Sequence, residues 1–415
     1  MCKRSPLPRL SSWPVSLSYP VDKYTGTRDY GFVIKAKVFH TDYLPSYTNA
    51  STYFVTIRKP ALPVVSMSTD YNNFFSADSG IYIQGTKGAT EIIDGQNLKA
   101  NWYQDWERKV FIEYFDASGT KRFGISAGAQ TMGAVSRNFD LKSLVIAMKS
   151  KYEKGEIDYP LFGSQGLKKY SAFLLRNSGN DWESGCMARD AIIQSVLRGQ
   201  VDLETQAYQP VVMFLNGEYW GLINMRERYD AEYFSRYHEN VKTDEIDLLK
   251  LRTSKYFDAS EGDTLRYKEM LAYLAANPMS VATNYDYVKK HYIDVDNMMN
   301  YYIAQLFCQN TDWPGNNARM WRPRYENGKF RFPIYDTDFG YGLYGGGSSM
   351  NSFSNLTGSS GAIAKLYKYM ILSPEFKADF IQRYAYMLNT TYAVSRLTTI
   401  ANDIKAKKVA PVIPK

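Results

Sequence analysis

Hydrophobic and polar residues alternate along much of the first half of the chain, and they recur at helical spacing along much of the second half. Alternation is clearest at 32–39 and 52–57, and it is typical of strands that bury one face. Apolar residues three and four positions apart predict helices at 263–275 and 294–309. Strands first and helices second predict an α+β fold.

Turn residues divide the strand-rich half into hairpins. Asn216-Gly217 between two apolar runs is the strongest hairpin signal in the chain, because this pair favours the tight turn that matches strand twist. A second turn is expected at 116–119. The strands that these turns join are expected at 109–115, 120–123, 210–215 and 218–223.

Helix signals are strongest near the end of the chain. Ser373 before Pro374 predicts a helix start, with a capping hydroxyl followed by proline at the first helical position, and this helix is expected to run to Leu388. Two more helices are expected at 188–197 and 394–407.

A proline-rich joint at 60–63 predicts a domain boundary. Residues 1–60 are expected to be a truncated β-sandwich, residues 61–225 a β-rich lobe and residues 226–415 a helix-rich lobe. Because the chain opens in strand-like sequence and stops after a helix-like run, we expect it to be a fragment, truncated at its C-terminus.

Composition narrows the class of protein. With 415 residues, 45% hydrophobic and 22% charged, the chain is of the soluble globular class. A dispersed net charge of +8 argues against nucleic-acid binding. Three Cys and three His, all scattered, argue against a disulfide framework and a His-based zinc site. No apolar run is long enough to span a membrane.

The stretch from Asn310 to Gly340 carries the candidate chemistry. Asp312 precedes Asn317 by five positions, a hairpin is expected to turn at 327–328, and Asp338-Phe339-Gly340 follows. Protein kinases use the same order, with one carboxylate at the acceptor hydroxyl and an amide and a second carboxylate on the metal. The alternative is a set of turn residues capping strands. No His-Arg pair precedes Asp312, which argues against an ordinary protein kinase.

The acidic pair Asp336 and Asp338 lies two positions apart. On a strand the two carboxylates would share one face. Two carboxylates on one face suit one or two hard cations with oxygen ligands, so we predict a metal site there.

Lys142 is the candidate lysine for nucleotide phosphates. It begins an expected strand at 142–148, after an expected loop that carries glycines at 124, 128 and 133. The alternative is an exposed strand lysine. Arg137 is a second candidate, because its planar fork suits phosphate. Glu227 and Asp190 are rival partners for Lys142, and their spacing does not choose between them.

Taken together, these motifs resemble those of the CotH (spore coat protein H) kinase family. The resemblance covers Leu62 to about Leu388 and rests on the runs 101–108, 136–144, 175–181, 215–221, 226–228 and 312–340. It implies a two-lobed atypical protein kinase fold, ATP, Mg²⁺ or Mn²⁺, and transfer to Ser or Thr of secreted or coat proteins. It also implies an extracytoplasmic or secreted location.

By motif match, Asp312 would be the catalytic Asp and Asp338 the metal Asp, with Lys142 as the phosphate lysine. One departure is Ala318-Arg319, where family members commonly carry an aromatic pair. Residues 15–58 resemble the end of a chitobiase-type β-sandwich. With the abundance of Tyr and Trp, this segment favours an alternative function, a non-catalytic scaffold or glycan-binding protein.

Overall fold

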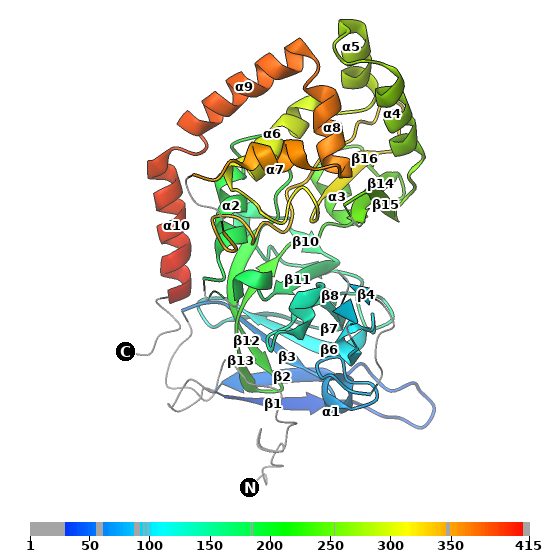
Figure 1. Ribbon diagram of the computed structural model, residues 1–415. Coiled ribbons are helices and arrows are strands. Elements are labelled where there is room, and N and C mark those ends of the chain that lie inside the picture. Colours follow the sequence, from blue (N-terminus) through cyan, green and yellow to red (C-terminus); the bar gives the residue numbers. More distant parts are fainter. Residues whose placement is uncertain are drawn as a thin grey trace. The chain divides into compact units, whose positions relative to one another are not determined.

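The computed structural model describes residues 30–54, 61–86, 92–93, 96–97, 99–182, 184, 186–252, 254–345 and 349–409. Helices and strands both occur, so the predicted α+β class is confirmed (Figure 1). The chain divides into two compact units. The first contains residues 1–157, 175–177 and 211–223, and the second contains residues 158–174, 178–210 and 224–415.

A closed barrel of seven strands dominates the first unit, in the order β11-β13-β12-β3-β6-β7-β8. Its strands are β3 (Val64–Ser68), β6 (Arg108–Phe115), β7 (Lys121–Met132), β8 (Ser143–Ala147), β11 (Ala172–Arg176), β12 (Tyr208–Leu215) and β13 (Glu218–Arg226). Strands β11, β12 and β13 carry the chain from one unit into the other. β12 and β3 run parallel, whereas the β3–β6, β6–β7 and β7–β8 pairs are antiparallel.

The predicted hairpins at both turns are confirmed. β6 and β7 pair across 116–119, and β12 and β13 are neighbours across Asn216-Gly217. Asn216 and Gly217 have φ of +50° and +86°. Both values lie in the left-handed region that the tight hairpin turn requires, and Asn and Gly reach it at the lowest cost.

The prediction of a glycine-bearing loop after the 116–119 hairpin is wrong. Gly124 and Gly128 lie within β7, opposite Glu113 and Lys109 of β6, and only Gly133 lies in the following turn, with φ of +111°. The reason is close packing on one face of a long strand. A Cβ on Gly128 would stand 2.5 Å from the Glu107 Cδ atom, so this glycine makes room for a side chain rather than for a ligand.

The first unit also contains a two-stranded sheet of β1 (Gly31–Ala36) and β2 (Asn49–Phe54), which pair antiparallel as the alternation predicts. Thr52 donates from Oγ1 to the buried Glu113 of β6 at 2.5 Å. Residues 15–29 and 55–58 of the predicted sandwich lie outside the described residues, and the sandwich itself stays a prediction. The remaining elements of this unit are α1 (Tyr71–Phe75), β4 (Ile92–Ile93) and β5 (Gln96–Asn97).

Helices make up most of the second unit. They are α2 (Arg189–Leu197), α3 (Ala231–Tyr237), α4 (Leu265–Ala276), α5 (Ala282–His291), α6 (Val295–Phe307), α7 (Ser352–Gly358), α8 (Ala362–Met370), α9 (Pro374–Asn389) and α10 (Val394–Val409). β15 (Tyr256–Glu261), β14 (Ile246–Arg252) and β16 (Arg319–Pro323) form a sheet. A short pair, β9 (Ile157–Asp158) and β10 (Lys169–Tyr170), completes the described strands.

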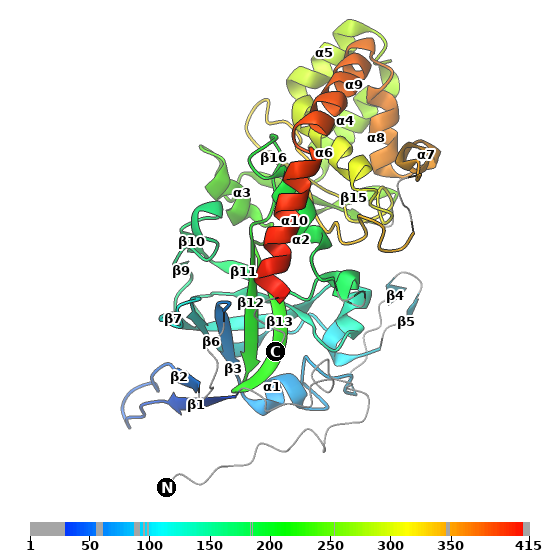
Figure 2. The same ribbon diagram turned by 90° about the vertical axis from the view of Figure 1, so that its left-hand side faces the viewer.

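The core of the second unit surrounds α6, which is buried on nearly every face. Its N-cap Asp294 accepts from the Asn297 backbone N–H. α10 packs along α2, as Figures 1 and 2 both show. The helices predicted at 188–197, 263–275, 294–309, 374–388 and 394–407 are confirmed as α2, α4, α6, α9 and α10, within a few residues at each end.

Candidate active site

The Asp312 loop begins where α6 ends. Asp312 accepts from the side-chain amides of Asn316 (Oδ1, 2.9 Å) and Asn317 (Oδ2, 2.6 Å). Asn317 adopts a left-handed backbone, with φ of +52°, which Asn tolerates better than most residues. The loop therefore folds back on itself and holds the Asp312 carboxylate against two amides.

A short hairpin separates this loop from the Asp-Phe-Gly run, as predicted. Asn327 at the turn has φ of +62°. Trp321 and Arg331 exchange two backbone hydrogen bonds of 2.9 and 3.0 Å. The regular strand in this region is β16, and it pairs mainly with β14 rather than within the hairpin.

The condition for a shared face, a strand through Asp336 and Asp338, is not met. Residues 333–340 form no strand, and Asp336 has φ of +53°, so the two carboxylates do not share a strand face. Side chains from elsewhere hold this segment instead. Thr337, between the two acids, donates from its N–H and its hydroxyl to Asp190 of α2, at 3.0 and 2.9 Å. Asp190 in turn pairs with Arg226 at the end of β13, at 2.8 Å.

Asp338 is 2% exposed, and its Oδ2 atom accepts from the Asn180 backbone N–H at 2.8 Å. The segment that carries it lies directly against the Asp312 loop. Thr311 donates from its N–H to the Phe339 carbonyl at 3.5 Å, and Tyr341 donates to the Cys308 carbonyl at 2.7 Å. The structure thus brings Asp312, Asn317 and Asp338 onto neighbouring loops of one compact unit.

Gly340 allows that close approach. A Cβ at this position would stand 2.6 Å from Ile193 Cδ1 of α2 and 3.2 Å from the Cys308 carbonyl oxygen. Any larger residue would therefore separate the Asp338 segment from α2 or from the end of α6.

Lys142 lies in the first unit and is 1% exposed, so the alternative of a solvent-exposed strand lysine is wrong. Its ammonium donates to the carbonyls of Arg137 (2.8 Å) and Phe139 (2.9 Å). It also lies over the Trp102 ring, 4.0 Å from the centroid. Burial lowers the pKa of Lys142 to about 7, with the charge of Asp140 acting in the opposite direction.

Arg137 makes its contacts in the same unit. Its guanidinium donates to the Trp102 carbonyl at 3.2 Å and pairs with Asp105 at 3.2 Å. Its Nε donates to the Gly133 carbonyl at 2.8 Å. These bonds hold Arg137 and Lys142 to one turn, because Lys142 itself bonds the Arg137 carbonyl.

Glu227 lies buried in the second unit among partners of its own. It accepts from the Tyr237 hydroxyl at 2.5 Å and from the Ala207 N–H at 2.7 Å, and it pairs with Arg198 at 3.3 Å. The pKa of Glu227 is raised, because the effect of burial exceeds that of these hydrogen bonds, which lower it. A pair between Lys142 and either Glu227 or Asp190 would join residues of different units and stays a prediction.

Oxygen donors of the kind that a hard cation takes are present on the two loops. Asp338, Asp336 and Asn317 offer carboxylate and amide oxygens, and Mg²⁺ is commonly held by one or two carboxylates together with phosphates and water. Donors of this kind suit a divalent cation, and backbone hydrogen bonds join the loop of Asn317 to the segment of Asp338. Within the described ranges, no group of three or more His, Cys, Asp or Glu side chains is placed to hold a metal ion.

Sequence reasoning missed two parts of this arrangement. Asn180 was not singled out, although it contacts Asp338 across 158 positions of chain. Asp190 was weighed only as a lysine partner, whereas it anchors Thr337. The polar run at 175–181 after a strand was the available signal for Asn180, but nothing in its spacing shows which loop it meets.

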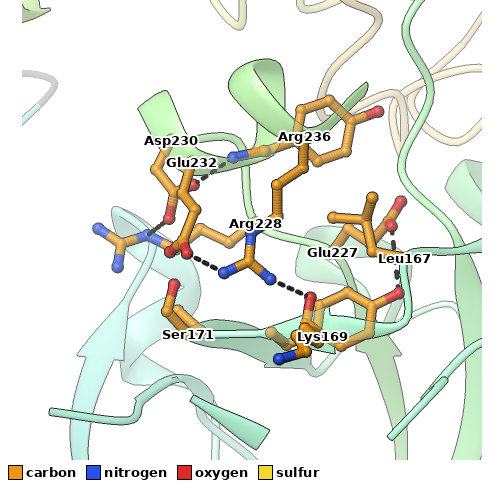
Figure 3. A pocket seen from close by; sticks show the side chains of 11 residues that line it. Leu167, Lys169, Ser171, Glu227, Arg228, Asp230, Glu232 and Arg236 are labelled. Carbon is orange, nitrogen blue, oxygen red and sulfur yellow. Dashed lines mark hydrogen bonds and ion pairs between the residues drawn. The ribbon is translucent and has the colours of Figure 1, made fainter. Parts of the chain in front are cut away.

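A pocket opens elsewhere in the second unit (Figure 3). Its lining includes Glu227, Arg228 and Arg236, but neither Asp312 nor Asp338. Arg236 donates to the Lys169 carbonyl at 2.6 Å and also pairs with Glu232, as the dashed lines show. The acidic and basic side chains at this pocket thus bond largely to one another.

Comparison with known proteins identifies the family of the chain. The sequence model of the CotH kinase protein family matches residues 129–414, more than half of the chain. The chain therefore belongs to the CotH kinase family. A search of curated proteins finds no match. Among the helices that the structure describes, none is long and apolar enough to cross a membrane.

Proposed function

We propose that this protein is an atypical protein kinase that transfers the γ-phosphate of ATP to Ser or Thr of secreted or coat proteins. Membership of the CotH kinase family supports the kinase class. The observation that carries the proposal is the contact between the Asp312 loop and the Asp338 segment, since kinase chemistry needs an acceptor-side carboxylate and a metal-side carboxylate close together.

Asp312 orients the acceptor hydroxyl and takes its proton. The hydroxyl oxygen then bonds to the γ-phosphorus as the bond from that phosphorus to the bridging oxygen breaks, and ADP leaves with the electron pair. The amides of Asn316 and Asn317 hold the Asp312 carboxylate in place, so little reorganisation is needed at the moment of transfer.

Asp338 and Asn317, with Asp336 beside them, would hold the divalent cation, Mg²⁺ or Mn²⁺. Such a cation would supply the positive charge that offsets the negative charge of the phosphates during transfer. Lys142 and Arg137 would neutralise the remaining phosphate charge, with Glu227 or Asp190 as the lysine's partner. We also propose that the chain has the two-lobed arrangement of a kinase. We further propose that the protein is extracytoplasmic or secreted.

A glycan-binding or scaffold role is the second candidate, and the β1–β2 sheet favours it. Phe32 and Tyr53 lie opposite each other in the strand register and are 45% and 57% exposed. Exposed aromatic rings on a flat sheet face are surfaces on which sugar rings stack. A protein of this kind would bind polysaccharide and leave ATP unchanged.

Incubation of the purified chain with γ-labelled ATP, Mn²⁺ and a generic Ser/Thr acceptor protein tests the proposal. We expect label in the acceptor, sensitive to chelation of the metal. Absence of transfer with both Mn²⁺ and Mg²⁺, combined with binding to insoluble polysaccharide, would favour the second candidate.

A further inference from the structure

We propose that the turn at Ser178–Asn180 is the positioning element for the Asp338 carboxylate, and that it acts through the Asn180 backbone N–H. This inference rests on the proposed function, because it assigns Asp338 to a bound cation. Asn180 is a positioning residue here, since it contacts the acid and not the nucleotide or the acceptor. All of the residues involved lie in the second unit.

The turn has an unusual backbone, and hydrogen bonds of the Ser178 hydroxyl hold it in place. Ser178 and Gly179 have φ of +79° and +58°, so two successive residues are left-handed. Ser178 is 3% exposed and donates from its hydroxyl to the Met187 carbonyl at 2.9 Å. Asn224 of β13 donates to the same hydroxyl from its side-chain amide. Strain at a non-glycine residue persists only where its surroundings fix it, and these bonds do so.

The residue after Asn180 is fixed as well. Asp181 is fully buried and accepts from the backbone N–H groups of Ala188 (2.7 Å) and Arg189 (2.9 Å), at the start of α2. Arg189 also forms an ion pair with it. Asn180 therefore lies between two anchored neighbours, and the direction of its N–H is set before any ligand arrives.

That N–H is one of the contacts that orient the Asp338 carboxylate. It donates to Oδ2 at 2.8 Å, and a hydrogen bond to an ionised carboxylate is stronger than a neutral one. With only 2% of Asp338 exposed, the carboxylate has little room to rotate away from the turn. A cation then meets an acid whose orientation is already fixed, which is the preorganisation that a binding site requires.

The Asn180 side chain reaches the other end of the same segment. Its amide donates to the Tyr344 hydroxyl at 3.3 Å, and the Tyr344 ring lies 4.9 Å from that of Phe339. Asn180 thus bonds both Asp338 and Tyr344. Only the backbone bond meets the acid, so removal of the side chain and distortion of the turn must have different effects.

Three variants separate these roles. Gly179→Ala places a side chain on a left-handed residue, which costs about 1–2 kcal/mol unless the turn moves, and it distorts the turn without substituting Asn180 itself. Gly199→Ala is the matched control, because Gly199 has φ of +68° and open space around a Cβ, so it carries the same backbone cost. Asn180→Ala removes only the amide that meets Tyr344.

We expect Gly179→Ala to raise the Mn²⁺ concentration for half-maximal ATP binding about tenfold, which corresponds to about 1.4 kcal/mol. Gly199→Ala and Asn180→Ala should change it less than twofold, measured by calorimetry. If Gly179→Ala and Gly199→Ala had the same metal affinity and lowered the melting temperature equally, the turn would have only a structural role. That result would overturn the inference.

Hydrogen exchange gives a readout that does not depend on catalysis. The Asn180 amide should exchange slowly in the wild-type chain and at least tenfold faster in Asp338→Ala, with Asp286→Ala, which removes an exposed carboxylate of α5, as the unaffected control. Unchanged exchange in Asp338→Ala would overturn the inference whatever the enzyme does. Fast exchange in Asp338→Ala, with no phosphotransfer by the wild type, would support the inference and count against the proposed function alone.

Discussion

Asp338 is the residue whose change should have the clearest effect on ligand binding. We expect Asp338→Ala to abolish metal-dependent ATP binding, because it removes the buried carboxylate assigned to the cation. Calorimetry with Mg²⁺ or Mn²⁺ measures this directly, and circular dichroism checks that the fold is retained. Nucleotide affinity equal to that of the wild type would remove Asp338 from the metal site.

Asp312 should affect turnover and leave nucleotide binding intact. Asp312→Asn keeps the size of the side chain but removes the base, so we expect a loss of roughly 10²–10⁴ in kcat. ATP affinity should remain near that of the wild type, because the proposal assigns Asp312 to the acceptor hydroxyl and not to the nucleotide. A near-normal phosphorylation rate in this variant would refute its assignment as the base.

Lys142 should make stability depend on pH. Its pKa of about 7 lies below its ordinary value of 10.5, so between these values the unfolded chain binds a proton that the folded chain lacks. Stability therefore rises with pH from about 7 to 10.5. Lys142→Met should lose this rise, measured by urea unfolding at several pH values. An equal rise in the variant would mean that other groups cause it.

At the scale of elements, caps decide where helices begin. Ser373 is 2% exposed, and its Oγ accepts from the Phe376 N–H at 3.3 Å, at the start of α9. We expect Ser373→Ala to lower the free energy of unfolding by about 1 kcal/mol. Thr264, the N-cap residue of α4, makes no such side-chain bond and is the matched control.

Urea denaturation of both variants measures the difference. Thr264→Ala should cost less than about 0.5 kcal/mol, as for a surface substitution without a special contact. An equal loss in the two variants would indicate that the cap bond contributes nothing beyond the change of residue.

At the scale of the whole molecule, one arginine joins distant parts of the second unit. Arg331, 14% exposed at its side chain, pairs with Asp202 (2.5 Å), Glu204 (2.6 Å) and Asp294 (2.5 Å). Burial alone would raise the pKa of Glu204, but His238 and Arg331 together lower it to about 2. The stability that Glu204 contributes is thus present above its ordinary pKa of 4.5 and is lost as the pH falls towards 2.

We expect Arg331→Met to destabilise the protein by about 3 kcal/mol at neutral pH, because it removes the arginine that pairs with the buried Glu204 and the partly buried Asp294. Lys242→Met is the control, since Lys242 is 72% exposed and pairs with the exposed Glu245, and it should cost less than about 1 kcal/mol. Thermal unfolding of both variants distinguishes them. Similar melting temperatures would show that the Arg331 network contributes little.

The sequence by itself determined the features that depend on near neighbours. Hairpins at 116–119 and 216–217 and the start of α9 followed from turn and cap chemistry, which acts over two to four residues. The kinase-like order of Asp312, Asn317 and Asp338 was also visible, because it is a matter of spacing. The glycines of β7 misled the prediction, since a glycine required by a packed neighbour looks the same in sequence as one required by a loop.

Only the tertiary structure decided what surrounds those residues. Asn180 meets Asp338 and Asp190 meets Thr337 across 158 and 147 positions, and no local periodicity encodes such contacts. Asp336 and Asp338 share no strand face, because Asp190 of α2 holds Thr337 between them and Asp336 has a left-handed backbone. Burial of Lys142 under Trp102 likewise depends on packing, which sets its pKa and which no count of residues could predict.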